Sequence, residues 1–529
     1  MKWRSRIVPA VMAVVVIGWL AAQFRPADVG GPFDLASFGR VLVVDQGRVK
    51  PLDTYARLKL MLISDRQTFV DNAGERRPAT RFMADAMTFA IGNDAVAQHE
   101  VFRIENGPVL ELMGLDPRPG HYRYSYRELH VQRNALIRQA MQAQQTDAAQ
   151  RSLFQRKVLE LWSQLATFEA IMSWREPLMA PPIGDAEEWR TLSEVATAAA
   201  ETADTTSPAA MVGRALGAYA ANNPETFNAE LERYHLAVRE HLPTQVGRAN
   251  TEMLFNRVDP FGNAMVLYLA AGLLVIVGWL VWMRPLHRSA VTLLVIALIV
   301  HTAAIVVRMV LQGRPPVTNL YSSAIFISWG CVGLGLVIEL LLRFGIGAAV
   351  AAVTGFLTLL IADRLGAGGE DTLEMMQAVL DTNFWLATHV TTITLCYVAT
   401  FVAGALSIAF IGLGLFTPLL RAGRLRALGR MIYGVVCFAL LLSFIGTVLG
   451  GIWADQSWGR FWGWDPKENG ALMIVLWNAV ILHARWGGMI GWRGVAAAAV
   501  FGNIITSWSW FGVNMLGVGL HSYGFMDSA

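Results

Sequence analysis

Four tryptophans lie in or just before the motif WGRFWGWDPKENGA, residues 458–471. They are Trp453, Trp458, Trp462 and Trp464. Tryptophan is enriched at both interfaces of a membrane, which explains an isolated indole but not this density. Asp465-Pro466 favours a turn, with the proline in the first turn of the next helix and Glu468 near its positive N-terminus. We interpret the segment as an aromatic shelf that this turn holds rigid, with Trp458, Trp462 and Trp464 pointing inward.

Four histidines lie within or at the ends of long apolar runs, where ionisable side chains are rare. They are His301, His389, His483 and His521. An ionisable side chain inside a membrane is costly unless it is paired, so each of them is a candidate functional residue. The alternative for any one of them is a neutral imidazole that donates a hydrogen bond to a neighbouring helix.

Imidazoles combined with an aromatic shelf indicate a flat ligand that contains iron. Imidazole is a common axial ligand of heme iron. Heme also offers wide apolar faces to indole rings, and its propionates require arginine, lysine or other polar hydrogens. We therefore predict a heme site beside the tryptophans.

The elements that must position these residues are apolar runs of about 20 residues, long enough to span the hydrocarbon core. We expect helices at 7–23, 262–283, 289–311, 321–342, 344–362, 386–415, 431–452, 468–484 and 494–520.

Basic residues orient these spans. Lys2, Arg4 and Arg6 predict a cytoplasmic N-terminus, whether 7–23 is a membrane anchor or a cleaved signal peptide. Counting crossings then places 24–258 and the tryptophan segment outside. The loops left in the cytoplasm carry the arginine excess that the positive-inside rule demands. These arginines are Arg284, Arg288, Arg343, Arg421, Arg424, Arg426, Arg430, Arg485 and Arg493.

This topology sets the histidines at two levels. His389 and His521 lie at the outer ends of their helices, level with the shelf. His301 lies roughly 18 Å from the inner surface, and His483 lies within an inward-going helix. Counting leaves His301 and His483 at depths that differ by about 10 Å, unless the helix at 468–484 starts above the membrane surface.

Composition excludes several classes of protein. The 529 residues are 54% hydrophobic and only 16% charged, and the net charge of +3 does not favour nucleic acid. The cysteines lie in apolar runs and form no CxxC or CxxCH, which argues against a disulfide framework, a zinc knuckle or covalently attached heme on this chain. They are Cys331, Cys396 and Cys437.

The polar segment 24–258 reads as a separate, mostly helical domain. Its sequence DQGRVKPLDTYARLKLML predicts a turn at Gly47 and Pro51, followed by an amphipathic helix capped near Asp53 or Thr54. The expected fold is thus an all-α polytopic membrane protein. It has an N-terminal membrane anchor (1–23), an extracytoplasmic domain (24–258) and an eight-helix membrane domain (259–529), whose tryptophan loop spans 453–468.

WGRFWGWDPKE resembles the WWD signature, usually WGxxWxWDPKE, of heme-handling proteins in cytochrome c maturation. The resemblance is closest to the CcsA (ResC) type of the system II cytochrome c synthase, and it covers about 262–525. HTAAIVVRMVLQGRPPVTNLYSS and LWNAVILHAR resemble the segments with the transmembrane histidines. FWLATHVTTITLCYVA and GLHSYGF resemble those with the external histidines.

The resemblance implies a transmembrane heme site at His301 and His483 and an external heme site at His389 and His521. At the external site, the shelf of tryptophans and Asp465 would hold heme b. Heme would move from the cytoplasmic side, stay reduced, and meet an apocytochrome c whose CxxCH thiols add to the heme vinyl groups. This makes the chain a cytochrome c heme lyase component in a bacterial inner membrane.

The implied partners are apocytochrome c, a ResB-like subunit, a thiol-reducing protein and membrane lipid, with no nucleic acid. The domain at 24–258 does not match ResB, although GRVKPLDTYAR is similar to a segment of longer CcsA-like chains. Two alternatives remain open at this point. One is a bis-histidine b-type cytochrome in quinone-linked electron transfer, and the other is a heme transporter or chaperone without ligation chemistry.

Overall fold

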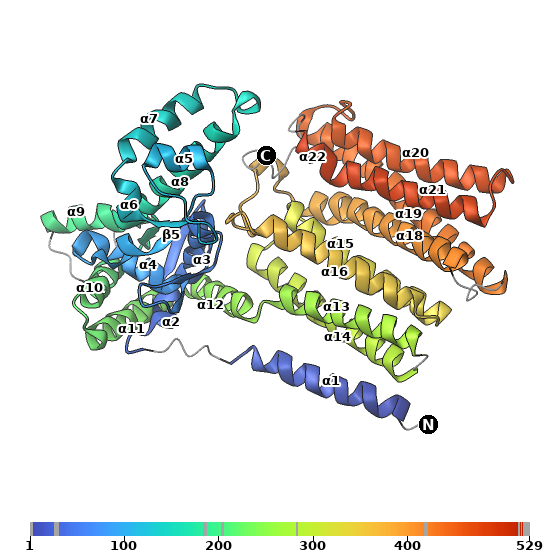
Figure 1. Cartoon of the computed structure of the whole chain (residues 1–529), viewed down its shortest axis with the longest axis horizontal. Coiled ribbons are helices and arrows are strands. Elements are labelled where there is room, and N and C mark those ends of the chain that lie inside the picture. The colour runs from blue at the N-terminus through green and yellow to red at the C-terminus, as the bar shows by residue number, and fades with distance from the viewer. Residues whose placement is uncertain are drawn as a thin grey trace. The chain divides into compact units, whose positions relative to one another are not determined.

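A computed structural model of the chain divides into two compact units (Figure 1). It describes residues 4–25, 31–183, 188–202, 206–281, 284–416, 422–516, 519 and 521. The membrane unit comprises 1–25, 258–365 and 376–529, and the N-terminal unit comprises 26–257 and 366–375. Segment 366–375, which the sequence analysis assigns to the membrane domain, therefore belongs with the N-terminal unit. Lys2 and Arg421, used above to orient the chain, lie outside the described residues.

The membrane unit is built from helices joined by short loops. They are α1 (Arg4–Ala22), α13 (Pro260–Leu280), α14 (Arg284–Gln312), α15 (Leu320–Leu342), α16 (Ile346–Gly366), α17 (Asn383–Trp385), α18 (Thr391–Phe416), α19 (Ala422–Trp458), α20 (Pro466–Trp486), α21 (Trp492–Ser507) and α22 (Val513–Met515). Two π-helical turns, Leu386–Val390 and Trp508–Gly512, connect α17 to α18 and α21 to α22.

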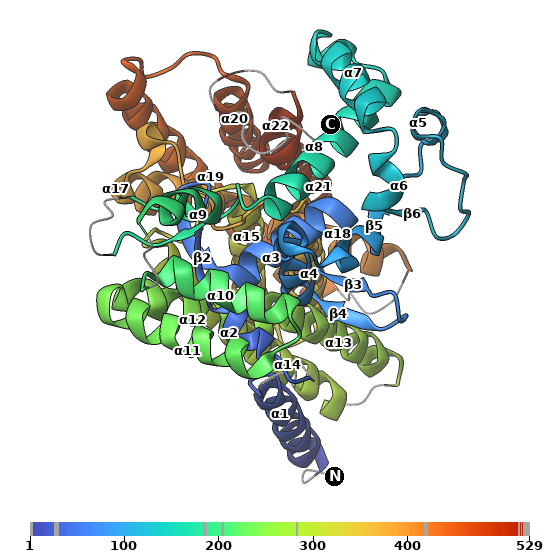
Figure 2. The same cartoon turned by 90° about the vertical axis from the view of Figure 1, so that its left-hand side faces the viewer.

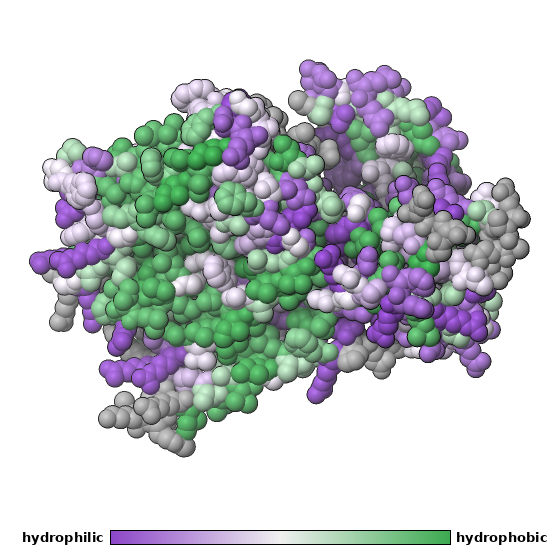
Figure 3. Space-filling view, turned by 180° about the vertical axis from the view of Figure 1, so that it is seen from behind, coloured by the Kyte–Doolittle hydropathy of each residue, from purple (hydrophilic) through white to green (hydrophobic). Residues whose placement is uncertain are grey.

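Seven helices of the described part are long and apolar enough to cross a membrane. The two other predicted spans are also helical. In α1 the apolar stretch is the shorter Ile7–Ala22, and α20 begins with the polar sequence Pro-Lys-Glu-Asn. Figure 3 shows the resulting apolar surface over the membrane unit. The predicted class, an all-α polytopic membrane protein, is confirmed.

Small residues let the membrane helices approach closely, as is usual where lipid supplies no hydrophobic driving force. Helix α18 packs against α15, α19 and α21. A methyl group added at Gly330 on α15 would overlap Val398 on α18, and one added at Gly404 on α18 would overlap Asn503 on α21. These glycines fix α18 at the centre of its neighbours.

The N-terminal unit is mostly helical, with three small antiparallel sheets. The largest has the order β2-β1-β7-β8, with β1 (Leu42–Asp45), β2 (Arg48–Pro51), β7 (Leu178–Ala180) and β8 (Arg190–Thr191). The other two pair β3 (Thr68–Val70) with β4 (Arg76–Pro78), and β5 (Glu100–Arg103) with β6 (Arg123–Ser125).

Helices surround these sheets (Figure 2). They are α2 (Leu35–Gly39), α3 (Leu52–Ser64), α4 (Ala79–Met87), α5 (Gly107–Met113), α6 (Tyr126–His130), α7 (Arg133–Gln144), α8 (Leu153–Met172), α9 (Leu192–Thr202), α10 (Pro208–Ala220), α11 (Pro224–His241) and α12 (Pro243–Val258). Helix α3 is central, because it contacts α4, α8 and strands of all three sheets.

The turn predicted around Gly47 is a β-hairpin. Gln46 and Gly47 both have positive φ angles, 52° and 77°, as a two-residue hairpin loop between twisted strands requires. The predicted capping of the following helix near Asp53 or Thr54 is wrong. Helix α3 begins earlier, directly after Pro51, and Asp53 in its first turn pairs with Arg57 instead.

Phe168 on α8 anchors an aromatic cluster in the core of the N-terminal unit. It is fully buried, and its ring centroid lies 5.9 Å from Phe82, 5.4 Å from Phe102 and 5.2 Å from Tyr126. These residues come from three other elements, so the cluster joins α8 to α4, β5 and α6.

Replacing this ring should destabilise the unit. We expect Phe168→Ala to lower its free energy of unfolding by about 3–5 kcal/mol, because the change removes buried apolar area and leaves a cavity. Pulse proteolysis of the full-length protein in detergent, across a urea series, measures this. Leu153→Ala on the same helix is the control, since Leu153 is 57% exposed. Equal losses in both variants would contradict the assignment of Phe168 to the core.

Candidate heme site

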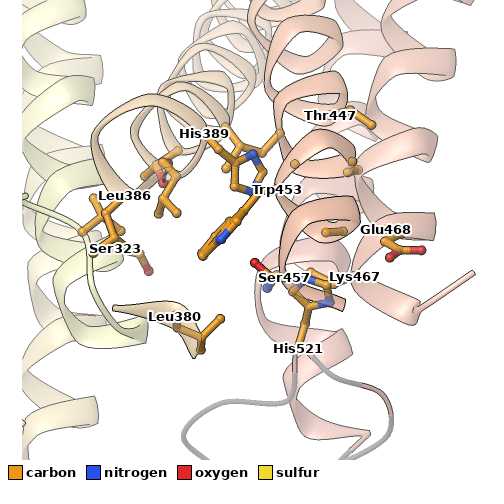
Figure 4. Close-up of a pocket in the computed structure, with 18 of the residues that line it drawn as sticks. Ser323, Leu380, Leu386, His389, Thr447, Trp453, Ser457, Lys467, Glu468 and His521 are labelled. Carbon is orange, nitrogen blue, oxygen red and sulfur yellow. Dashed lines mark hydrogen bonds between the residues drawn. The ribbon is translucent and has the colours of Figure 1, made fainter. Parts of the chain in front are cut away.

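One cavity of the membrane unit collects most of the residues predicted for the external site. Its lining includes His389, His521, Trp453, Trp458 and Trp462. Figure 4 shows His389 and His521 facing this cavity from different elements, with Trp453 between them. The lining comes from the start of α15, the segment before α17, and α18, α19, α20 and the C-terminal segment. Segments far apart in the sequence thus form a single, mainly apolar chamber.

His389 is held in one orientation by a backbone hydrogen bond. It lies in the π-helical turn before α18, and its Nδ1 is 2.8 Å from the carbonyl oxygen of Gly446 on α19. A carbonyl oxygen only accepts hydrogen bonds, so Nδ1 carries the proton and Nε2 keeps its lone pair. A hydrogen bond of this kind commonly orients histidines that bind metals.

Glycine on α19 makes room for this imidazole. A methyl group added at Gly450 would lie 2.5 Å from Cε1 of His389, closer than any real contact. Gly446 and Gly450 are one helical turn apart, so one accepts the hydrogen bond and the next admits the ring. Helix α19 is therefore shaped around His389.

Aromatic rings continue the wall beside His389. Trp453 lies 5.7 Å from His389 between ring centroids, and it stacks on Trp385 at 6.5 Å with an interplanar angle of 14°. The indole of Trp385 donates from Nε1 to Oε1 of Gln456, at 3.0 Å. This bond fixes the outer ring of the stack and so supports Trp453.

His521 lies on the opposite side of the cavity, against the tryptophan loop. Its ring meets Trp458 edge-on, with centroids 5.1 Å apart. Its Nδ1 is 3.2 Å from Oδ1 of Asp465. His389 lines the same cavity. The two imidazoles thus share one chamber.

The turn after the tryptophans is a complete capping box. The carboxylate of Asp465 accepts from the backbone nitrogen of Lys467 at 2.8 Å. Glu468 reaches back and accepts from the backbone nitrogens of Gly463 (2.8 Å) and Asp465 (3.1 Å). Asp465 is buried and does not line the cavity. It holds the loop and lies beside His521, so the structure gives it a positioning role.

Trp464 departs from the predicted arrangement. Its φ angle is +57°, its side chain is 68% exposed, and it does not line the cavity. It meets Trp462 edge-on at 6.0 Å. The positive φ turns the chain just before Asp465, which sends this indole outward. The inward direction predicted for Trp464 is therefore wrong, whereas Trp458 and Trp462 do line the cavity.

The two inner histidines are not brought together. His301 on α14 is fully buried, with Nδ1 3.0 Å from the hydroxyl of Tyr268 and its ring edge-on to Phe261. His483 on α20 is exposed, and its Nδ1 donates to the carbonyl oxygen of Ala479. Figures 1 and 2 show α14 and α20 on opposite sides of the unit. A heme site shared by His301 and His483 stays a prediction that this packing does not support.

Lys467, Gly446 and Gly450 belong to the site, although the sequence analysis did not single them out. Lys467 lines the cavity, and its Nζ donates to the carbonyl oxygen of Trp510 at 3.1 Å. Its position inside the WDPKE motif was a usable signal. The four-residue spacing of the glycines shows that one helix face is small, but not which side chain needs the space.

Known proteins match the part of the sequence that forms the cavity and much of the remaining chain. Residues 317–521 match the family model described as Cytochrome C assembly protein, and every residue that lines the cavity lies within this range. The cytochrome c biogenesis protein CcsA of Parasynechococcus marenigrum (strain WH8102) is 32% identical over 302 residues, 50% of this chain and 95% of that protein.

Two further relatives differ in how much of the chain they match. CcsA of Synechococcus sp. (strain RCC307) is 34% identical over 279 residues, 46% of this chain and 88% of that protein. Protein NrfI of Wolinella succinogenes is 26% identical over 530 residues, 93% of this chain but only 54% of that protein. The N-terminal unit thus has a counterpart in NrfI. The chain belongs to the CcsA family of cytochrome c biogenesis proteins.

Proposed function

We propose that the cavity binds heme b between His389 and His521 and presents it for covalent attachment to an apocytochrome c. The observation that carries this proposal is that two imidazoles and four indoles line one apolar chamber. The membership in a family of cytochrome c biogenesis proteins supports the same pathway. Heme is the cargo of this site rather than a resident cofactor.

The donor set fits heme. His389 offers Nε2 as an iron ligand, because its Nδ1 donates a hydrogen bond to the carbonyl oxygen of Gly446. Trp453, Trp458 and Trp462 supply flat apolar faces. The ammonium group of Lys467 in the wall supplies a positive charge for a propionate.

The protein contributes position rather than a nucleophile. In the attachment, each thiol of CxxCH adds across one vinyl group. A carbon–sulfur bond forms, the thiol proton goes to the other vinyl carbon, and no net oxidation or reduction occurs. Holding the vinyl groups where the thiols approach removes much of the entropic cost of such a reaction.

The histidine of the apocytochrome must displace one of the two ligands. We expect His521 to leave, because its side chain is 25% exposed and lies in the C-terminal segment beyond α22. His389 packs tightly against α19, where Gly446 accepts its hydrogen bond and Gly450 leaves space for its ring. It is therefore suited to stay on the iron.

The same proposal includes a side of the membrane and a set of partners. The arginine-rich loops favour a bacterial inner membrane protein whose tryptophan loop and N-terminal unit face the periplasm. A ResB-like subunit and a thiol-reducing protein would complete the pathway.

If the N-terminal unit docks apocytochrome or replaces part of ResB, deleting 30–255 should abolish maturation. Intact maturation in that deletion would rule this role out.

Removing the two proposed ligands, His389 and His521, should remove heme from the cavity. We expect the His389→Ala/His521→Ala protein to lose most of its b-type heme, because both axial donors are gone. Each single variant should abolish formation of holocytochrome c. Absorption spectra with pyridine hemochrome, together with heme staining of a co-expressed cytochrome c, measure these outcomes.

Other outcomes discriminate the alternatives. Unchanged heme in the double variant, with loss in His301→Ala or His483→Ala, would overturn the assignment to the cavity. Permanent heme that reacts with quinol and is irrelevant to c-type cytochromes would favour a b-type cytochrome. Heme delivery without attachment would favour a transporter or chaperone.

The close fit of the His389 ring against α19 can be tested at Gly450. We expect Gly450→Ala to lower heme affinity roughly 10- to 100-fold, because the new methyl group displaces the imidazole from its oriented position. Gly434→Ala is the matched control on the same helix, since nothing lies within 4 Å of a methyl group added there. Heme titration of both purified variants measures the effect. Equal affinities would show that the close approach does not matter.

A further inference from the structure

A short segment between α16 and α17 is built into the N-terminal unit, although the chain on both sides of it belongs to the membrane unit. It comprises Gly366–Met375. Gly369 and Asp371 make close contacts there, and Leu373 is buried. We call this the anchored segment.

Gly369 lies directly on the backbone of α3. A methyl group added at Gly369 would be 2.8 Å from the backbone nitrogen of Leu62 and 3.1 Å from the carbonyl oxygen of Leu58. Its φ angle is +77°, a conformation that favours glycine. A larger residue would have to lift the segment off the helix.

Asp371 is tied to the GRVKPLD sequence. Its Oδ2 accepts from Arg48, at 2.9 Å from Nε and 2.6 Å from Nη2, and it lies 2.7 Å from Nζ of Lys50. Its Oδ1 accepts from the backbone nitrogen of Leu373, which is itself buried. Both cations come from β2, the second strand of the hairpin.

These contacts belong to a balanced, buried network of charges. Its cations are Arg48, Lys50 and Lys59, and its anions are Asp45, Glu252 and Asp371. Burial alone would raise the pKa of Asp371, but the charges of Arg48 and Lys50 outweigh it and lower that pKa below its ordinary value. The carboxylate is therefore ionised at neutral pH. Removing the charge of Asp371 leaves Arg48 paired with Glu252 and Lys50 with Asp45, but the network then holds one more cation than anions, which is unfavourable at this depth.

The anchored segment runs straight into the wall of the heme cavity. Met376 and Leu380 line that cavity. Met376 lies five positions after Asp371, and a stretch of that length reaches at most about 18 Å when fully extended. Chain connectivity therefore keeps Met376 within that distance of Asp371.

We propose that Arg48 and Lys50 are positioning residues for the heme cavity, acting through Asp371 on the wall formed by Met376 and Leu380. This inference rests on the proposed function, because it assigns the N-terminal unit a part in retaining the heme that the cavity binds. The GRVKPLD sequence thereby acquires a role. It holds the segment that keeps the wall of the cavity in place.

The test compares two isosteric changes in the same network. Asp371→Asn removes the anion that carries the segment, whereas Glu252→Gln removes the other carboxylate bonded to Arg48, at 2.6 Å and 3.0 Å, and leaves the segment tied. Both variants should lower the thermal stability of the N-terminal unit. We expect only Asp371→Asn to speed the transfer of heme from the purified full-length protein to apomyoglobin, by several-fold.

Gly369→Ala provides a second route that leaves every charge in place. It should also speed heme transfer several-fold, because its methyl group pushes the segment off α3. Transfer rates equal to wild type in both Asp371→Asn and Gly369→Ala would overturn the proposal. So would an equal acceleration in Glu252→Gln, since that would reflect general destabilisation.

The result is separable from the proposed function. Suppose that wild-type protein holds heme that depends on His389 and His521, but that Asp371→Asn and Gly369→Ala leave the rate of heme transfer unchanged. Then only this inference fails. If wild-type protein holds no such heme, the proposed function fails first.

Discussion

The proposed heme site depends on the close approach of α18 and α19 around one imidazole. The carbonyl oxygen of Gly446 accepts a hydrogen bond from Nδ1 of His389, and Gly450 leaves the space that the ring needs. A π-helical turn at Leu386–Val390 places the histidine at this contact. The remaining walls of the cavity are arranged around an imidazole whose orientation and tautomer are set before any ligand arrives. Such preorganisation suits the proposed role of the cavity, which is to bind heme and then release it.

The second half of the site is organised by a helix terminus. The capping box of Asp465 and Glu468 satisfies backbone nitrogens at the start of α20 and closes the tryptophan loop. The same carboxylate of Asp465 lies beside His521. One turn therefore does two jobs: it ends the aromatic loop and positions the second imidazole. Since Lys467 belongs to this turn, a cation for a heme propionate comes from the same few residues.

The N-terminal unit is linked to the cavity by covalent continuity. Its buried ion pairs bind Asp371, and the chain that leaves this anchor soon lines the cavity. Buried ion pairs are weak evidence for stability, because desolvation offsets much of their attraction. Their value here is specific geometry, since a single oxygen of Asp371 meets both Arg48 and Lys50. The match to NrfI over nearly the whole chain agrees with a unit that works together with the membrane helices.

Composition and spacing by themselves determined the membrane class of the protein and the approximate helix positions, because hydrophobic length is a local property. They also set His389 and His521 at one level, and both line one cavity. Tertiary structure decided what local patterns cannot carry. It turned Trp464 outward through a positive φ angle and placed Asp465 beside His521 rather than in the cavity wall. It also set α14 and α20, which carry His301 and His483, on opposite sides of the unit. It also brought Asp371 to Arg48, 323 residues away in sequence. Such pairings depend on packing between distant segments, and no periodicity within either segment encodes them.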